Sequence, residues 1–547
     1  MKIKATSDLW WKDAVLYCLD VETFYDGDGD GCGDFAGLTD RLDYLSGMNV
    51  SCVWLMPFYP SANKDDGYDI VDFYGVDPAL GTLGDFTEFI RTARDRGIRV
   101  IADFVMNHTS NQHPWFQSAR SSRDSPYRDF YVWRDDKPDE KPGDVVFPDK
   151  ETSNWAWDEE AGQYYLHRFY SHQPDLNVAN PRVRDELAQV MAFWIEQGLS
   201  GFRVDAVPFL IEPTGMPEGA MHDPHALLRD LRAYLNRRSG EAVLLGEVNL
   251  DAEERRKFFG DEDGDELHMV LDFLGDQALF LALARGEAEP LARALTTGPA
   301  LPQASSLGRF VRNHDELTLD KLPDDERAEV FARFGPDPDV QLYGRGIRKR
   351  LPTMLGGDER AIRMVYSLAF SLPGTPVIFY GEEIGMGENL EIEGRYSVRS
   401  PMQWSAEPNG GFSTARELRR PMTRGEYGPE RINVHAQRRD PHSLLSWFER
   451  LIRRRRECPE LGFGTLELLD AGTPSVLAHR CDWEGSTIVA VHELAGRAAE
   501  VALPLDDGDA LVDLFDDHEH PLPATLPLEP YAASWFRVRR GTTRLAP

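Results

Sequence analysis

Three carboxylates, two histidines and one arginine stand at or near the ends of separate apolar, strand-like runs of the sequence. They are Arg203, Asp205, Glu247, Asp315, His108 and His314. Carboxyl groups that share a site can divide the work of catalysis, one acting as an ionised nucleophile and another holding a proton to donate. A single arginine–aspartate pair, as in GFRVDAV at 201–207, is more often a structural ion pair. Six such residues on different runs indicate an active site, provided that the fold brings the runs together.

Eight strand-like runs supply the scaffold for these residues, and amphipathic helical stretches alternate with them. The expected strands are 14–21, 50–58, 98–107, 201–207, 242–248, 268–274, 308–315 and 375–383. The helix expected over 81–97 has Thr82 and Asp85 as capping residues and Gly97 as its stop signal. Eight β/α units predict an α/β fold, a TIM barrel, in which the carboxyl ends of all strands meet at one face. The candidate residues would gather at that face.

The spacing of the runs predicts two additions to the barrel. The stretch between the third and fourth strands is too long for a plain loop, so we expect an inserted domain over 108–176. After a last helix near 442–457, alternating strands and turns predict a C-terminal antiparallel β-sandwich domain over 458–547. The barrel itself would then comprise residues 1–107 and 177–457.

The composition narrows the range of partners. A net charge of −32 and a pI near 4.8 disfavour nucleic acid and anionic membranes, and a small neutral substrate fits best. The sequence has no apolar run long enough to span a bilayer and no signal-peptide pattern at its start. Five scattered cysteines without a CxxC pair suit reduced thiols. We therefore expect a cytoplasmic protein, and the question of a homo-oligomer stays open.

Four motifs carry a resemblance to a known family. In order, DFVMNH (103–108), GFRVDAV (201–207), LLGEV (244–248) and FVRNHD (310–315) are similar to the four signature regions of the α-amylase family, glycoside hydrolase family 13. The resemblance implies that Asp205 is the nucleophile, Glu247 the general acid/base and Asp315 a stabiliser of the transition state. Retaining glycoside hydrolysis needs two carboxyl groups about 5 Å apart, which agrees with these roles. Arg203 would keep the nucleophile ionised, and the resemblance places His108 and His314 against sugar hydroxyls.

Two further motifs point to the substrate. DDGYDI (65–70) and VRSPMQW (398–404) resemble the family segments that hold a non-reducing glucose, here through Asp65, Tyr68 and Arg399. A dead-end pocket of this kind favours short α-glucosides over long chains. Other phrases, such as SLPGTPVIFYGEEIGMGENL, resemble family members that interconvert maltose and trehalose by intramolecular glucosyl transfer. That activity, with some hydrolysis, is the first expectation.

The sequence leaves two alternatives to this activity. Residues 248–250 and 271–280 differ from those relatives near the expected acceptor pocket, which leaves an α-glucosidase that hydrolyses such disaccharides as the alternative. A non-catalytic binding protein on the same fold is disfavoured, because the chain retains all three carboxylates.

The acidic run DGDGDGCGD at 26–34 offers oxygen ligands at alternate positions, but an EF-hand is rejected because its twelfth position is Gly37. The resemblance implies a structural Ca²⁺, or Mg²⁺ as the alternative ion, in this loop. Its ligands would be Asp26, Asp28, Asp30, the Cys32 carbonyl and Asp34. A second calcium site is implied less strongly, with ligands from Asn107, Asp175, the carbonyls of Phe209 and Leu210, and Glu212.

Overall fold

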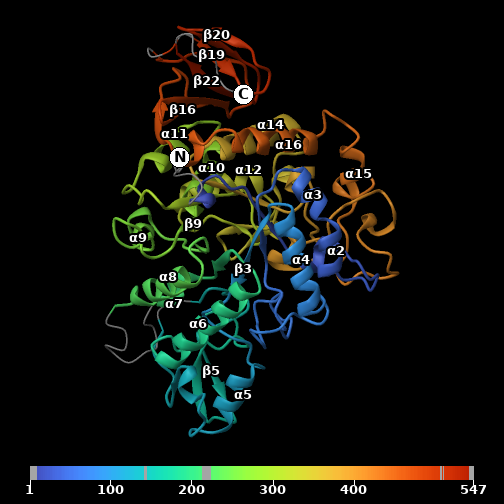
Figure 1. Ribbon diagram of the computed structural model, residues 1–547, viewed down its shortest axis with the longest axis vertical. Helices are drawn as coiled ribbons and strands as arrows, with labels where there is room; N and C mark the ends of the chain where they lie inside the picture. The colour runs from blue at the N-terminus through green and yellow to red at the C-terminus, as the bar shows by residue number, and fades with distance from the viewer. Residues whose placement is uncertain (1–8, 141–144, 212–222, 506–507, 509, 541–547) are drawn as a thin grey trace.

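The centre of the molecule is a closed barrel of eight parallel strands. The structure, a computed structural model, describes residues 9–140, 145–211, 223–505, 508 and 510–540 (Figure 1). The barrel strands are β1 (Leu16–Leu19), β2 (Cys52–Leu55), β3 (Arg99–Phe104), β7 (Gly201–Val204), β8 (Val243–Gly246), β9 (Met269–Leu271), β10 (Ser306–Arg309) and β14 (Thr375–Phe379). Each of the eight lies within or overlaps one of the expected runs, so the predicted TIM barrel is confirmed.

The barrel closes between its first and last strands. β1 pairs in parallel with β14, with Leu16 opposite Val377, and on its other side with β2. The residues of β1, β2, β7, β8 and β14 are all buried. Continuous apolar runs of this kind suit strands whose two faces are both covered, by the barrel interior and by helices.

The helices begin and end where local signals place them. In α4 (Leu83–Asp95), Thr82 and Asp85 form the expected capping box, and Gly97 beyond its end has a φ of +71°. The other helices are α1 (Val21–Phe24), α2 (Phe35–Asp40), α3 (Leu42–Gly47), α5 (Pro114–Ser121), α6 (Pro181–Glu196), α7 (Val207–Ile211), α8 (Ala226–Arg238), α9 (Ala252–Lys257), α10 (Phe273–Arg285), α11 (Glu289–Thr296), α12 (Asp324–Phe334), α13 (Leu351–Met354), α14 (Glu359–Ser371), α15 (Val434–Gln437), α16 (Leu444–Arg456) and α17 (Glu460–Phe463).

All eight strands are shorter than the predicted runs, because the chain leaves the sheet sooner, as two of the runs illustrate. The run 308–315 contributes only its start to β10, and residues 310–315 form a loop in which Asn313 accepts a hydrogen bond from the Asp315 amide (3.1 Å). The run 268–274 is divided between β9 and the start of α10. Side chains such as Asn313 and Asp315 bond to nearby backbone groups and so favour turns over a sheet ladder.

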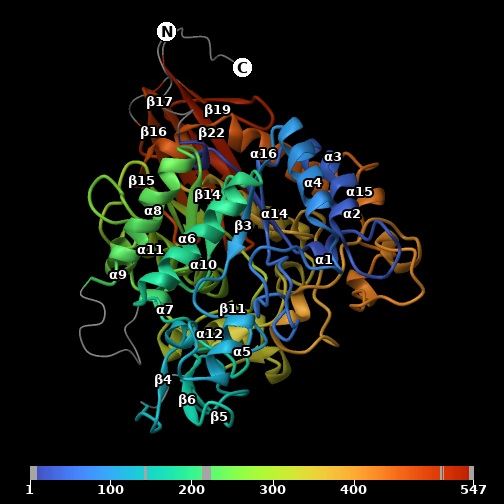
Figure 2. The same ribbon diagram turned by 60° about the horizontal axis from the view of Figure 1, so that its bottom comes forward.

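Two excursions project from the carboxyl ends of the strands. The first carries a three-stranded antiparallel sheet of β4 (Trp133–Arg134), β6 (Gln163–Leu166) and β5 (Trp155–Asp158), the lobe at the bottom of Figure 1. The second carries α12 and a small sheet of β11 (Leu317–Thr318), β13 (Gly346–Ile347) and β12 (Gln341–Leu342). Figure 2 turns the β4–β6–β5 lobe toward the viewer, and the two excursions contact each other through Tyr343 and Phe147, whose ring centroids lie 5.4 Å apart.

The C-terminal part is all antiparallel and lies at the opposite end of the molecule from the inserted lobe (Figure 1). One sheet has the order β15 (Thr465–Leu469), β16 (Val476–Trp483), β17 (Ser486–Glu493), β22 (Ala533–Arg539), β19 (Ala510–Asp513) and β20 (Glu519–Pro521), and the other pairs β18 (Ala499–Ala502) with β21 (Thr525–Leu528). The antiparallel C-terminal domain is therefore confirmed. Within the described ranges, we find no helix with the length and apolarity to cross a membrane.

Candidate active site

One arginine joins the carboxylates at the ends of two neighbouring strands. β7 and β8 pair in parallel with Val204 opposite Gly246, so the residues that follow them, Asp205 and Glu247, emerge side by side. Arg203 Nη1 donates to Asp205 Oδ1 (2.6 Å), and Arg203 Nη2 donates to Glu247 Oε2 (2.7 Å). The same guanidinium pairs with Asp103 on β3 and is almost completely buried. Arg203 therefore sets the positions of both catalytic candidates.

A left-handed turn directly after Asp205 strengthens this arrangement. Ala206 has a φ of +47°, a conformation that residues with a Cβ seldom adopt. In this turn the Ala206 amide donates to Glu247 Oε2 (3.1 Å). The chain thus turns sharply beside the nucleophile candidate and gives the acid candidate a second hydrogen bond.

The two carboxyl groups differ in proton affinity, as an acid and a nucleophile must. Burial raises the pKa of Glu247 to about 7, Arg203 opposes the rise, and the neighbouring carboxylates Asp205 and Asp315 add to it. Burial also raises the pKa of Asp205 to about 6, although Arg203 lowers it. Glu247 is therefore the better proton donor near neutral pH, and Asp205 the better anion.

Asp315 is held ionised by the guanidinium groups of two arginines, Arg395 and Arg399. Its Oδ1 accepts from Arg399 Nη2 (2.8 Å) and Arg395 Nη1 (3.0 Å), and its Oδ2 lies 3.3 Å from His314 Nε2. Burial alone would raise its pKa, but the charges of Arg395 and Arg399 outweigh burial and hold the pKa well below its usual range. A permanent anion at this point suits the stabilisation of a cationic transition state.

The aromatic candidates stack against one another beside these carboxylates. The rings of Tyr68 and His314 are stacked at 12°, and Tyr68 Oη lies 2.9 Å from His314 Nε2. His108 Nε2 lies 3.1 Å from the Tyr68 carbonyl. Burial lowers the pKa of His108 to about 4 and places that of His314 well below its usual value, so both rings are neutral. Neutral imidazoles can both donate to and accept from sugar hydroxyls.

Asp65 has partners that were not expected from the sequence. Arg399, which the resemblance places at the same sugar as Asp65, pairs with Asp66 and donates through Nε to the His314 carbonyl (2.7 Å). Asp65 Oδ1 accepts from Arg395 Nη2 (2.6 Å) and from the Tyr396 hydroxyl (2.6 Å).

Sequence reasoning missed Arg395, Tyr396 and Asp103. The proximity of the first two to VRSPMQW and the position of Asp103 within an apolar strand were the available signals.

Comparison with known proteins places this site in a family. The model of the α-amylase catalytic domain matches residues 21–318 and 347–464. The chain belongs to the α-amylase family. A trehalose synthase of Pimelobacter sp. is 40% identical over 97% of this chain and 96% of its own length. An oligo-1,6-glucosidase of Halalkalibacterium halodurans is 28% identical over 96% of this chain and 98% of its own length. The crystal structure of Bacillus licheniformis trehalose-6-phosphate hydrolase has a TM-score of 0.77 at 26% identity, with 97% of this chain and 100% of that chain covered.

The two excursions of this α-amylase-family chain meet over the site. Arg345, between β12 and β13, donates to the Val146 carbonyl of the inserted lobe (2.7 Å), and Tyr343 packs against Phe147 with ring centroids 5.4 Å apart. Phe147 in turn lies under the Arg395 guanidinium, 5.0 Å from its ring centroid. An unbroken set of contacts thus runs from both excursions to the arginine that touches Asp65 and Asp315.

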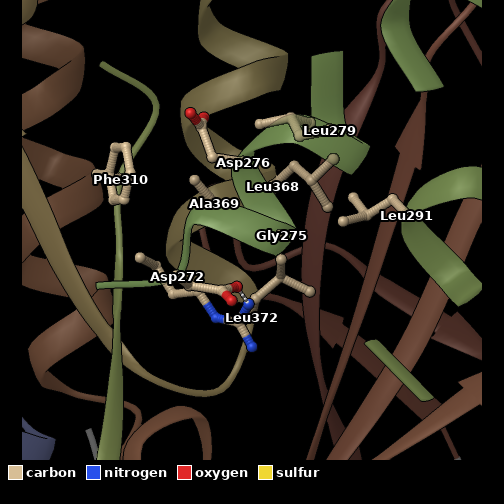
Figure 3. Close-up of a pocket in the computed structure, with 10 residues that line it drawn as sticks. Asp272, Gly275, Asp276, Leu279, Leu291, Phe310, Leu368, Ala369 and Leu372 are labelled. Atoms are coloured by element: carbon tan, nitrogen blue, oxygen red, sulfur yellow. Dashed lines mark hydrogen bonds and ion pairs between the residues drawn. The ribbon is translucent and has the colours of Figure 1, made fainter. Parts of the chain in front are cut away.

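The segments 248–250 and 271–280, expected near the acceptor pocket, contact the base of the second excursion. Asn249 Nδ2 and Gln277 Nε2 both donate to Asp320 Oδ1, at 2.8 and 3.3 Å. Other residues of α10 line a small cavity of about 20 Å³ outside the barrel, between α10, α11 and α14 (Figure 3). Asp272 in this cavity is neutralised by Arg255 and Arg309. These segments therefore fix the second excursion to the barrel.

The acidic loop before α2 brings three of its predicted ligands together. Carboxylate oxygens of Asp26, Asp28 and Asp34 lie within 4.8 Å of one another, whereas Asp30 is outside this group and accepts from the Cys32 amide (2.8 Å). Clustered hard oxygen ligands suit Ca²⁺ or Mg²⁺. The loop fits a structural cation through these three residues.

The second predicted cation set does not fit an ion in this arrangement. The Arg168 guanidinium donates to the Phe209 carbonyl (2.6 Å) and lies 3.5 Å from Asp175 Oδ2. Asn107 also donates to Asp175 (3.2 Å). A fixed positive charge thus already faces two of the expected ligands. Leu210 is buried in α7, and Glu212 lies outside the described residues.

Proposed function

We propose that this protein is a retaining enzyme that acts on short α-glucosides and interconverts maltose and trehalose by intramolecular glucosyl transfer, with some hydrolysis. The observation that carries the proposal is the pairing of Asp205 and Glu247 on one buried guanidinium, with ionised Asp315 beside them. Likeness to trehalose synthases over nearly the whole chain supports the choice of substrates.

The proposed reaction has two balanced halves. A carboxylate oxygen of Asp205 attacks the anomeric carbon of the non-reducing glucose, the bond to the glycosidic oxygen breaks, and Glu247 gives its proton to that oxygen. The products are a glucosyl ester on Asp205 and a free glucose. In the second half Glu247 takes the proton of the anomeric hydroxyl of that glucose, whose oxygen attacks the glucosyl carbon and releases Asp205. Asp315 stabilises the oxocarbenium-like charge in both halves.

Isomerisation needs the released glucose to stay while it turns over, so water has to be kept out of the site. The contacts of Arg345 and Tyr343 with the inserted lobe support such a closed site. The alternative is an α-glucosidase, in which water takes the place of the acceptor glucose, and the oligo-1,6-glucosidase likeness supports it at lower identity. A non-catalytic binding role is disfavoured by the assembled carboxylates.

Product analysis separates these functions. Purified protein incubated with maltose should yield trehalose with glucose as a minor product, and added labelled glucose should enter the trehalose only slightly. Glucose as the sole product would favour the α-glucosidase. Complete inactivity on maltose, trehalose and nitrophenyl α-glucoside would favour the binding protein.

A structural cation is part of the proposal. We place Ca²⁺, or Mg²⁺, against Asp26, Asp28 and Asp34, whose clustered oxygens support it. Because such an ion binds the folded state, chelator should lower the melting temperature of the wild type. Asp28→Asn should remove this sensitivity, whereas Asp40→Asn, an equal charge change at an exposed residue of α2, should preserve it. Equal melting curves of the wild type with and without chelator would refute the proposal that this loop binds a stabilising cation.

We also propose that the enzyme works in the cytoplasm. All five cysteines are buried and unpaired, which supports a reducing compartment.

A further inference from the structure

We propose that Arg395 and Tyr396 form a latch that occupies the sugar-binding carboxylates Asp65 and Asp315 and competes with the substrate for them. The inference rests on the proposed function, because it assumes that Asp65 holds the non-reducing glucose. It adds that protein side chains occupy these carboxylates, so the substrate has to displace them.

Asp65 already has most of the hydrogen bonds that its carboxylate can accept. Its Oδ1 accepts from Arg395 Nη2 (2.6 Å) and the Tyr396 hydroxyl (2.6 Å), and its Oδ2 accepts from Gln173 Nε2 (2.9 Å). Two carboxylate oxygens offer about four acceptor positions. A sugar that makes a pair of hydrogen bonds to Asp65 therefore has to remove at least one of these donors.

Arg395 fills the space between the two carboxylates. One arm of its guanidinium reaches Asp65, and the other reaches Asp315 Oδ1 at 3.0 Å. Its side chain is only 12% exposed, and its Nε is buried and has no hydrogen-bond partner among the described residues. A guanidinium in this place offers two carboxylates the donors that sugar hydroxyls would otherwise supply.

The segment that carries the latch is held more firmly on its inner side than on its outer side. Tyr396 and Arg395 lie in a short 3₁₀ turn, Gly394–Val398. Outside, Glu393 pairs with Lys150 (2.6 Å), but both side chains are largely exposed, and such pairs contribute little. A Cβ built on Gly394 would meet no atom within 4 Å. The start of the turn therefore borders open space, whereas its end is fixed by Ser397 Oγ, which donates to the Arg348 carbonyl (3.0 Å). Arg395 and Tyr396 lie next to the free end.

Competition of this kind lowers the apparent affinity for the sugar, since only the unlatched fraction binds. Weakening the latch should therefore tighten ligand binding. A residue that merely supported the site or contacted the sugar would have the opposite effect when altered.

The test is Tyr396→Phe, which removes the hydroxyl and keeps the ring. The probe is 1-deoxynojirimycin, an iminosugar with the hydroxyl groups of glucose, and its Kd is measured by calorimetry. We expect a roughly three- to tenfold lower Kd and a lower KM for maltose. Tyr74→Phe is the matched control, because Tyr74 donates a like bond to Glu186 (2.9 Å) on the barrel exterior, and it should leave both constants unchanged.

A second measurement needs no variant. In the wild type, the iminosugar should increase hydrogen exchange over residues 390–396, whereas an ordinary binding loop would be protected. An unchanged or higher Kd in Tyr396→Phe, or protection of 390–396, would overturn the latch. Failure of the proposed isomerisation is recognised separately, by the absence of trehalose among the products.

Discussion

At the residue scale, Arg203 dominates the site because three carboxylates depend on it. Its bonds to Asp205 and Glu247 hold two like charges in contact with a single cation, and Asp103 completes its surroundings. The side chain of Asp205 is 11% exposed and that of Glu247 is 24% exposed. The nucleophile is therefore buried against the strand, and the acid faces the space where a leaving group would depart.

Replacement of Asp205 tests the nucleophile. Asp205→Ala should reduce kcat by several orders of magnitude on maltose, because no other described carboxylate is bound to Arg203 Nη1 except Asp103 behind it. Steady-state kinetics measures this loss, and circular dichroism confirms that the fold is kept. Retention of more than a tenth of the wild-type rate would contradict the assignment.

The pH dependence of activity tests the roles of Asp205 as nucleophile and Glu247 as acid. Activity needs Asp205 ionised and Glu247 protonated, so with pKa values of about 6 and about 7 the kcat/KM should fall below about pH 6 and above about pH 7. Because the two groups share Arg203, their titrations are coupled. The two apparent pKa values of the pH profile therefore describe the pair and not either residue alone.

Glu247→Gln should abolish the upper limb on a nitrophenyl α-glucoside, which needs little protonation, and should cost far more activity on maltose. Equal losses on the two substrates would argue against Glu247 as the acid.

At this scale the sequence predicted which charged residues form the site better than it predicted which of them bond to one another. Asp205, Glu247 and Asp315 meet because each follows a barrel strand, a rule that sequence order reveals. Which of Arg395 and Arg399 bonds to Asp65 depends on where a short turn places the two side chains. The periodicity of the sequence does not predict this placement. The resemblance places Asp65 and Arg399 at the same sugar, but it does not indicate that Arg395 is the arginine bonded to Asp65.

At the scale of elements, the hold of the barrel on the second excursion should control how much water reaches the glucosyl enzyme. Asp320 is the anchor, since Asn249 and Gln277 both donate to it. Asp320→Ala should raise the ratio of glucose to trehalose formed from maltose several-fold, because a loosened cover admits water. Chromatography of the products measures this ratio.

The matched control for this change is Asp325→Ala, which removes an exposed aspartate from the first turn of α12 in the same excursion. It should leave the product ratio unchanged. If both variants behave like the wild type, the anchor has no part in the partition between transfer and hydrolysis.

The elements themselves were largely predictable, but their ends were not. Apolar runs and caps located all eight strands and the capping box of α4. The ends of β9 and β10 were misplaced, because apolar residues such as Phe273 and Phe310 continue past the sheet to pack against each other (5.2 Å between ring centroids). Tertiary packing of this kind leaves no distinct period in the sequence.

At the scale of the whole molecule, the C-terminal domain is fastened to the barrel by buried polar bonds on α14. Ser367 Oγ accepts from Trp535 Nε1 (3.0 Å) and lies 3.0 Å from His492 Nε2. Ser371 Oγ lies 3.0 Å from His479 Nε2. The Ser367 hydroxyl on α14 is therefore the hydrogen-bond partner of buried side chains on two strands of the C-terminal domain, β22 and β17.

Ser367→Ala should lower the stability of the protein by about 2 kcal/mol, because it leaves two buried donors or acceptors without a partner. Thermal melting measures the effect. Ser446→Ala is the control, since its hydroxyl bonds the Asp440 carbonyl at an exposed turn beside the start of α16. A melting temperature in Ser367→Ala equal to that of the control would show that the interface tolerates the loss.

The pairing of β1 with β14 delays closure of the barrel during synthesis of the chain. Leu16 leaves the ribosome 361 residues before its partner Val377, the difference between the two residue numbers. At about 5–20 residues per second, β1 waits roughly 20 to 70 s for that neighbour. During this interval the unfinished sheet has two open edges, and either can pair with another nascent chain. The yield of active enzyme should therefore depend on chaperones and on the density of ribosomes along the message.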